Sequence, residues 1–237
     1  MKLAVLASLL FTAFRVDGFS SPAATAPFSS TTPLLPGEID AAAAYAKSTF
    51  PISPEDLVVR AKKVLSPDVG IGTKDNGACL ADDFEFVAAV VGPISKSEYL
   101  NAVNGFKLED SFDIQQHFFG FTVDPMQTNR VWWFDRQIAK QINTFMGAQP
   151  TADNELTLPP QLFHMDFTED GLVKEFGFYT VDRRQGNTGG LGGAFGYFYG
   201  VGKPLPIREC QPFKPSFRFR MLGVLGKIGK RLSKKSE

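Results

Sequence analysis

The sequence has few of the residues that usually build metal centres and disulfide frameworks. Only two cysteines, Cys79 and Cys210, and two histidines, His117 and His164, occur in 237 residues. Two cysteines cannot form a disulfide framework or a four-ligand zinc site, and the histidines lack the spacing to other ligand residues that marks a metal centre. We therefore expect no metal and no cofactor, and either two free thiols or a single bridge.

Long hydrophobic runs are also missing, since residues 3–14 fall short of the roughly 20 that a spanning helix needs. That stretch follows Lys2 and precedes Gly18, which predicts a signal peptide over residues 1–18. Residues 19–36 contain Ser, Thr, Ala and Pro but no acidic residue, which is typical of a transit peptide-like segment. The two together resemble the bipartite presequence of diatoms and related algae. A complex plastid is the expected location, and a secreted protein is the alternative.

Acidic residues are scarce at the carboxyl end, where residues 203–237 hold ten Lys or Arg against only Glu209 and Glu237. This segment has a net charge of +8, which leaves −8 for the rest of the chain. Helical spacing puts Leu225 and Ile228 on an apolar face, with Lys227, Lys230 and Arg231 towards the other face and the end. Such a basic amphipathic tail suits an anionic membrane surface or a partner, while a solvated, disordered tail is the alternative. The acidic body argues against nucleic acid as a partner.

The remaining chain has the pattern of an α+β domain. Helices are predicted at residues 39–49, from Ser53, and from Ser95, because Ser53 and Ser95 can each cap a helix ahead of an acidic residue. Long strands are predicted at residues 82–87, 112–123, 130–142, 158–168 and 172–182, with Asp170-Gly171 as a hairpin turn. Helices first and strands afterwards favour helices packed on one face of a curved sheet.

This order, with the DDFEF strand and the runs FFGFTVDPMQTNRVWWFDR and DFTEDGLVKEFGFYTVDRRQGNTGGLGG, resembles the nuclear transport factor 2-like fold, which includes the SnoaL-like polyketide cyclases. The resemblance covers about residues 50–202 and is closest to an uncharacterised plastid group in algae and plants. It implies a cone-shaped, curved antiparallel sheet with N-terminal helices on one face. We expect the domain over residues 37–202, including a C-terminal Gly-rich segment. The resemblance leaves activity open, because this scaffold serves enzymes and binding modules alike.

The alternation of side chains between the two faces of each predicted strand identifies the candidate site residues. His117 shares a predicted face with Phe119 and Phe121, so it is expected in an apolar pocket as a neutral base. Asp135, on the face of Trp133, and Asp83 are the carboxylates expected to reach the same pocket. The predicted catalytic residues are thus His117, Asp135 and Asp83, and the predicted ligand-binding residues are Phe119, Phe121 and Trp133.

His164 and Asp166 are predicted on the opposite face from Phe163 and Met165. There, an acidic outer surface with one His is favoured over a catalytic pair. The Gly-rich run has glycines at 192, 196 and 200, which would let a helix there approach another helix closely. A packed hairpin or a flap over the pocket mouth is one alternative, and a partner or membrane contact is the other.

Three functional classes follow from these patterns. The first, which we favour, is a non-catalytic binding or scaffold module for an apolar small molecule, held at the thylakoid surface by its tail. The second is a cofactor-independent SnoaL-like enzyme, such as a cyclase, isomerase, dehydratase or hydrolase, that uses His and Asp acid-base chemistry. The third is a subunit that forms a homodimer through the open sheet face.

Overall fold

The computed structural model describes residues 33–151 and 155–233, with side chains up to Lys227. The predicted signal peptide and residues 19–32 of the predicted transit segment lie outside the described residues. The chain divides into two units, residues 1–40 and 41–237. In the first unit, residues 33–40 are exposed and turn at Pro36-Gly37, where the Leu35 backbone nitrogen donates to the Glu38 carboxylate at 2.8 Å.

The second unit begins with helices whose ends follow their capping residues. α2 starts after Ser53, whose hydroxyl accepts from the Asp56 nitrogen at 3.1 Å. α3 starts after Ser95, which forms a full capping box with Glu98. The helices are α1 (Ala41–Tyr45), α2 (Pro54–Val64), η1 (Gly70–Gly72), α3 (Lys96–Phe106), α4 (Leu108–Ser111), α5 (Gly193–Gly200), η2 (Arg208–Cys210) and α6 (Phe217–Ser233).

Two sheets follow, and the larger has the strand order β2-β1-β9-β8-β5-β4. All of its neighbouring strands are antiparallel except β1 and β9, which run parallel. The smaller sheet has the order β3-β6-β7. The strands are β1 (Leu80–Phe86), β2 (Ile94–Ser95), β3 (Phe112–Gln115), β4 (Phe118–Val123), β5 (Arg130–Asp135), β6 (Ile138–Gln141), β7 (Glu155–Thr157), β8 (Gln161–Phe167) and β9 (Val173–Thr180). The expected α+β class with a curved, mainly antiparallel sheet is confirmed.

Two of the predicted long strands are each broken in the middle. The prediction of one strand over residues 112–123 is wrong because β3 and β4 belong to different sheets, and the same holds for residues 130–142, which form β5 and β6. Both breaks lie side by side, since the Arg136 nitrogen donates to the His117 carbonyl at 3.3 Å. One bent hairpin therefore contributes to both sheets, which curves the fold around its interior.

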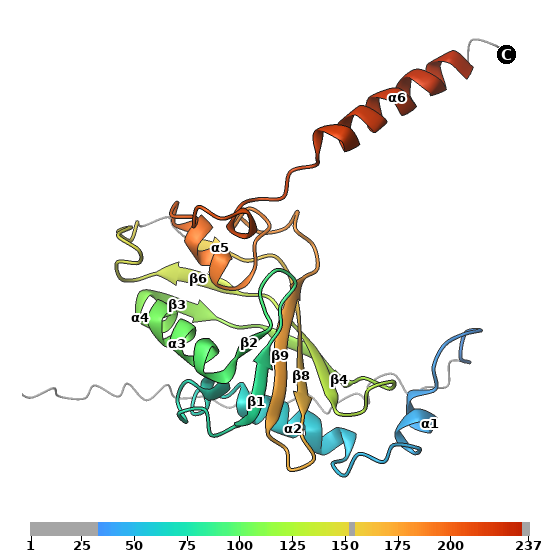
Figure 1. Cartoon of the computed structure of the whole chain (residues 1–237), viewed down its shortest axis with the longest axis vertical. Helices are drawn as coiled ribbons and strands as arrows, with labels where there is room; N and C mark the ends of the chain where they lie inside the picture. Colours follow the sequence, from blue (N-terminus) through green and yellow to red (C-terminus); the bar gives the residue numbers. More distant parts are fainter. Residues whose placement is uncertain (1–32, 152–154, 234–237) are drawn as a thin grey trace, which may run out of the picture. The chain divides into compact units, whose positions relative to one another are not determined.

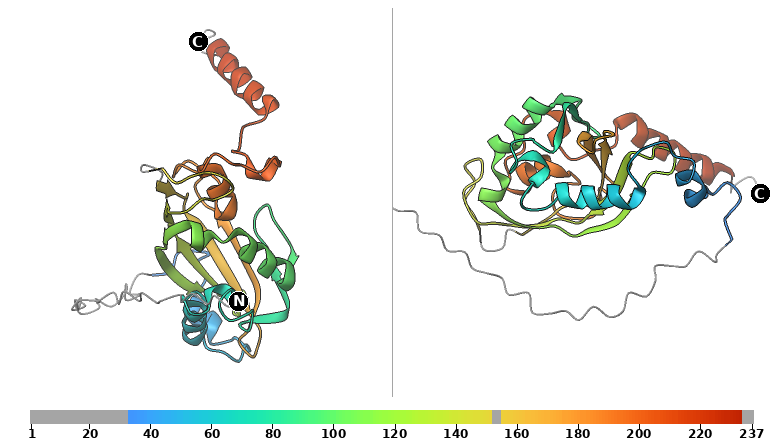
Figure 2. Two further views of the ribbon diagram at one scale, coloured as in Figure 1. Left: turned by 90° about the vertical axis from the view of Figure 1, so that its left-hand side faces the viewer. Right: turned by 90° about the horizontal axis from the view of Figure 1, so that it is seen from below.

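Helices and sheets enclose two apolar cores. In the first, α2 packs on β4 and β5 around Leu57, Val131 and Trp133, all fully buried. Figure 1 shows α2 crossing the strands near one end, and Figure 2 shows it along its length in the view from below. In the second, α5 and the smaller sheet pack around Phe112, Leu156 and Phe198. Both cores thus lie on the inner side of the bent hairpin.

The glycines of α5 allow it to lie close to the smaller sheet. A side chain at Gly196 or Gly200 would meet the side chains of Leu158 or Leu156 at 3.3 and 2.6 Å. The glycines thus allow a close approach, but to Leu156 of β7 and to Leu158 just after it, and not to the second helix that was predicted. Cys79 and Cys210 are free thiols.

The last helix, α6, carries Phe217, Phe219 and Leu225, whose side chains are all exposed. Among the described residues, no helix has both the length and the apolar character needed to cross a membrane.

Candidate functional site

A large cavity of about 1020 Å³ lies between the larger sheet, α3 and the segment around α5. Figure 1 shows these elements, with α3 in green and α5 in orange beside β9. The volume is at the upper end of the range for small-molecule pockets. We take it as the candidate functional site.

The floor of the cavity is aromatic and comes mainly from the inward-facing residues of β1, β8 and β9. Phe163 of β8 contacts Phe178 of β9 with ring centroids 5.4 Å apart, and Phe86 of β1 contacts Phe176 at 5.7 Å. Tyr99 and Val103 of α3 line the facing wall. The β8–β9 register puts Phe163, Phe176 and Phe178 on one apolar face, and all three line the cavity.

One end of the cavity is lined by neutral polar side chains. Gln161 is fully buried, and its amide oxygen accepts from the Gly193 nitrogen at 2.8 Å. The Tyr197 hydroxyl donates to the Gln137 amide oxygen at 3.1 Å, and the Gln137 amide nitrogen donates to Gln116 at 2.7 Å. Sequence inspection missed these glutamines, since nothing in their spacing separates them from surface residues.

Charged groups lie at the border of the cavity. Arg183 stacks over the Phe213 ring, 5.9 Å from its centre, and Lys214 follows on the same segment. Across the cavity, Glu109 is exposed and forms an ion pair with Lys74 at 2.6 Å. No His lines the cavity, and its Asp and Glu residues, Asp110, Glu109 and Glu209, are exposed. The interior therefore offers hydrogen bonds and apolar surface, with its carboxylates confined to the border.

His117 lies elsewhere than expected. It is exposed at the break between β3 and β4, and its Nδ1 is 2.8 Å from the Arg136 carbonyl oxygen. Its backbone nitrogen donates to Asp135 at 3.0 Å. The expected placement of His117 in an apolar pocket is wrong, because the residue lies at the bend of the hairpin and outside the cavity.

Asp135 is buried on the inward face, as predicted, and lies opposite Gln161 in the β5–β8 register. Burial raises the pKa of its carboxyl above the ordinary value, although backbone hydrogen bonds from His117 and Arg136 act in the other direction. One of its oxygens, Oδ2, has no hydrogen-bond partner among the described residues. Asp135 thus lies next to the polar end of the cavity without lining it.

A β-bulge explains why the predicted aromatic face is split. The β4–β5 register shifts between Phe119 and Thr122, where Gly120 has a φ of +70°. Phe121 stacks on Trp133 on the inward side, whereas Phe119 stacks on Phe134 and is 48 % exposed. The prediction that Phe119 and Phe121 share a face is therefore wrong.

The other predicted residues also lie outside the cavity. Trp133 is fully buried and supports the floor by stacking on Phe163 at 5.5 Å. Asp83 is exposed and forms an ion pair with Lys174 at 3.3 Å, so its expected place in the pocket is wrong.

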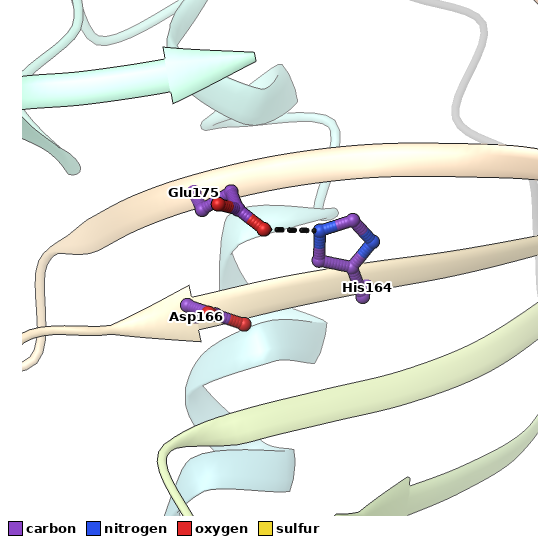
Figure 3. A group of neighbouring side chains, drawn as sticks. All are labelled: His164, Asp166 and Glu175. Carbon is purple, nitrogen blue, oxygen red and sulfur yellow. Dashed lines mark hydrogen bonds and ion pairs between the residues drawn. The ribbon is translucent and has the colours of Figure 1, made fainter. Parts of the chain in front are cut away.

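The outward face of the same strands carries a buried ionic network, shown in part in Figure 3. Arg130 donates to Asp166 at 2.7 Å and to Glu175 at 2.8 Å. Gln127 donates to Asp166 at 2.6 Å. His164 is fully buried and bonds Glu175 at 2.9 Å. His164, Asp166 and Glu175 thus share the outward face, as predicted, but the first two are buried and the third is half-buried.

Trp132 and Tyr179 flank His164, with ring centroids 5.2 and 5.7 Å from its own. Burial lowers the pKa of His164, while the hydrogen bond to Glu175 acts in the other direction. A neutral imidazole must donate from Nε2 to the carboxylate, which leaves the buried Nδ1 unpaired.

His164, Asp166 and Glu175 also lie close enough to share a cation. Arg130 already forms ion pairs with both carboxylates, so the structure favours a salt-bridge network here.

On the predicted membrane-contact segment, Leu225 and Lys227 are exposed on α6. The side chains of Ile228, Lys230 and Arg231 lie outside the described residues. The prediction for these five residues stays a prediction.

No family model and no curated protein matches the chain. Solved structures similar to it include AclR of Streptomyces galilaeus (17 % identity, 77 % of this chain and 96 % of that one, TM-score 0.43). A protein of Jannaschia assigned as a SnoaL-like polyketide cyclase has 18 % identity, 56 % and 88 % coverage, and a TM-score of 0.39. An epoxide hydrolase of M. tuberculosis has 9 % identity, 54 % and 84 % coverage, and a TM-score of 0.40. SnoaL-like proteins, which the sequence motifs resemble, are thus among the similar structures, and these likenesses carry no function over to the chain.

Proposed function

We propose that this protein is a binding module that holds an apolar small molecule in the cavity and does not transform it. The observation that carries the proposal is the aromatic floor, in which Phe86, Phe163, Phe176 and Phe178 line one continuous space. Burial of apolar ligand surface there contributes roughly 25 cal/mol per Å² before the cost of association is subtracted. A terpenoid, pigment or lipid chain has the apolar area that such a floor requires.

The chemistry of the interior supports binding over turnover. General acid-base catalysis requires a titratable group within hydrogen-bond reach of the reacting atom. Tyr99 and Tyr197 line the cavity, but burial raises the pKa of each hydroxyl well above its ordinary value. Their hydroxyls already donate to the Ile71 carbonyl and to Gln137. The described groups inside the cavity therefore hold a ligand better than they exchange protons with it.

The alternative, a cofactor-independent SnoaL-like enzyme, is favoured by one observation. Asp135 combines a raised pKa with an unpaired oxygen next to the cavity-lining Gln161. As an enzyme, the protein would use Asp135 as its acid or base, with His117 acting only through its backbone hydrogen bond to that carboxylate. If the wild-type protein retains its ligand unchanged over many hours, this alternative is contradicted. If the wild-type protein converts the ligand and Asp135→Asn does not, the alternative is supported.

A filled cavity tests the binding proposal. Ala102 lines the cavity from α3, and Ala102→Trp places an indole into that space. Asn101→Trp, at an exposed neighbouring position outside the cavity, is the matched control. We expect wild type and Asn101→Trp to bind N-phenyl-1-naphthylamine with enhanced fluorescence, and Ala102→Trp to bind it at least tenfold more weakly. Equal binding by all three proteins contradicts the proposal.

We further propose that the protein works in a complex plastid at the thylakoid surface, with α6 as the membrane contact. The support is the α6 sequence, which has five basic residues and no acidic one, and the exposed apolar side chains of Phe217, Met221 and Leu225. Basic residues near an anionic bilayer contribute about 1 kcal/mol each, and the apolar side chains add their burial among acyl chains.

Charge reversal on α6 tests the membrane contact. Arg218→Glu/Arg220→Glu is expected to weaken binding to anionic phosphatidylglycerol vesicles by about thirtyfold or more, because two attractive contacts become repulsive. The matched control, Lys47→Glu/Lys63→Glu, reverses two exposed residues outside α6 and is expected to bind like wild type. Equal loss in both double variants points to net charge alone and contradicts a specific role of α6.

Homodimer formation through the outward sheet face stays a prediction. Phe119 of β4 stacks on Phe134 and is exposed, so it offers apolar surface on that face. Sedimentation velocity of the full chain tests it directly: a dimer in wild type that Phe119→Asp converts to a monomer supports the contact, and a monomeric wild type rules it out.

A further inference from the structure

The inward face of β5 and β8 has unpaired buried polar groups close to the polar end of the cavity. Trp133 Nε1, Asp135 Oδ2 and Gln161 Nε2 have no hydrogen-bond partner among the described residues. Their side chains project from the inward face of β5 and β8, where Asp135 is paired with Gln161 and Trp133 with Phe163. Buried polar groups are nearly always paired in native proteins, and Gln161 is the one of these three residues that lines the cavity, so its free amide nitrogen points to a ligand contact.

The orientation of the Gln161 amide is fixed by the backbone. Its oxygen accepts from the Gly193 nitrogen, and a backbone N–H can only donate, so the free end of the amide is the nitrogen. Thr180 lies opposite Gln161 in the β8–β9 register. A side chain at Gly192 would meet the Gln161 oxygen at 2.6 Å and the Thr180 hydroxyl at 2.9 Å, so only glycine allows this loop to approach. Gln161 and Thr180 are both among the residues that line the cavity.

The charge at this end selects among polar ligand groups. Asp135 lies next to Gln161 on the neighbouring strand and is fully buried. A carboxylate ligand would be repelled by the ionised form of this side chain. An ammonium group has no lone pair, so it cannot accept a hydrogen bond from the Gln161 nitrogen. A neutral oxygen accepts from the amide without either conflict.

We propose that Gln161 and Thr180 bind the carbonyl or hydroxyl oxygen of an otherwise apolar ligand, and that the aromatic floor binds its hydrocarbon part. This assignment rests on the proposed function of the cavity and adds the chemical class: neutral ketones, aldehydes, alcohols or esters with a large apolar body. One buried hydrogen bond of ordinary strength favours such a ligand over its hydrocarbon analogue by about fivefold to tenfold.

A matched set of bicyclic compounds tests the assignment on the full chain. 2-Ethylnaphthalene, 2-acetylnaphthalene, 2-naphthoate and 2-naphthylmethylamine differ mainly in the group at one end. Each is measured by displacement of N-phenyl-1-naphthylamine and corrected for its partition between water and octanol. We expect the ketone to bind about fivefold to tenfold more tightly than the hydrocarbon, with the carboxylate and the amine weaker than the ketone.

Two variants then place the preference at this end of the cavity. Gln161→Leu is expected to remove the preference for the ketone and to leave the hydrocarbon affinity within about twofold. Gln115→Leu, an exposed glutamine outside the cavity, is the matched control and is expected to retain it. Because Gln161→Leu also removes the partner of the Gly193 nitrogen, Thr180→Val serves as a second variant, with a smaller loss of the same preference.

The outcomes separate this inference from the proposed function. Hydrocarbon and ketone binding with equal affinity, or a preference for the carboxylate or the amine, overturns the assignment of Gln161 and Thr180 while the cavity still binds apolar compounds. An unchanged preference in both variants overturns it as well. Absence of binding by all four compounds and by the fluorescent probe overturns the proposed function itself, and this assignment with it.

Discussion

The two faces of the larger sheet are built from alternate residues of the same three strands and differ in almost every physical respect. The inward face of β5, β8 and β9 carries Trp133, Phe163 and Phe176, stacked nearly parallel. The outward face carries Arg130, Asp166 and Glu175 in a charged network. Because neighbouring residues point to opposite faces, one set can form a cavity floor while the other fixes the strands to one another. The ligand chemistry and the stability of the sheet are therefore separable by mutation.

The largest expected effect breaks the outward network. Asp166→Ala removes the main partner of the Arg130 guanidinium, whose side chain is only 17 % exposed. This change is expected to lower the free energy of unfolding by about 3–5 kcal/mol. Asp113→Ala, at an exposed position on β3, is the control and is expected to change it by less than about 0.5 kcal/mol. Urea unfolding followed by fluorescence measures both.

The affinity of the folded Asp166→Ala protein for N-phenyl-1-naphthylamine is expected to stay close to that of wild type, because no residue of the network lines the cavity. A large loss of affinity without loss of stability shows that the two faces are not separable. Arg130→Met/Asp166→Leu/Glu175→Gln removes all three charges of the network and is expected to recover much of the stability, since no unpaired buried charge remains.

A change of pH is expected to have an effect of intermediate size on the stability of the fold. His164 on the outward face and Asp135 on the inward face contribute to it with opposite signs. The lowered pKa of His164 means that the folded state binds its proton less readily than the unfolded state does. This contribution to stability is complete above the ordinary value of 6.5 and is lost as the pH falls below it towards the folded pKa. The raised pKa of Asp135 acts in the other direction, since stability is gained as the pH falls through that pKa towards 3.8.

Unfolding experiments between pH 7.5 and 4.5 check these signs. His164→Gln is expected to reduce the loss of stability below pH 6.5, and Asp135→Asn is expected to make the loss on the acid side steeper. A change in the same direction for both variants contradicts the assigned environments.

The smallest effect is expected at a residue that the sequence nominated for catalysis. Asp83→Ala breaks only an exposed ion pair with Lys174, and is expected to lower the free energy of unfolding by less than about 1 kcal/mol, with unchanged probe binding. Thermal unfolding with and without probe measures both. A tenfold loss of probe binding places Asp83 at the cavity after all.

Local signals in the sequence were sufficient for the helix starts and the hairpin. Ser53 and Ser95 cap α2 and α3, and Asp170-Gly171 turns between β8 and β9 with Gly171 at a φ of +84°. Each of these depends on residues within four positions of one another. The α+β class follows from their order along the chain.

Long-range features were beyond the same reasoning. The bulge at Gly120 puts Phe119 and Phe121 on opposite faces of the sheet, because one inserted residue moves every following side chain to the other face. The bend at His117 depends on Asp135, 18 residues away, which accepts from its backbone nitrogen. Gln161 becomes a cavity residue only because the glycine loop near α5 folds back on it. The aromatic floor was partly predictable from alternation, but its polar end was not.

The most direct test of the central claim is native mass spectrometry of the full-length protein after exposure to a total lipid extract of a plastid-bearing alga. Wild type and Asn101→Trp are compared with the filled-cavity variant Ala102→Trp. The account predicts a stoichiometric adduct on the first two proteins, released on extraction as a neutral, apolar, oxygen-containing compound, and none on the third. An adduct that Ala102→Trp retains, or an empty wild-type protein, would contradict it.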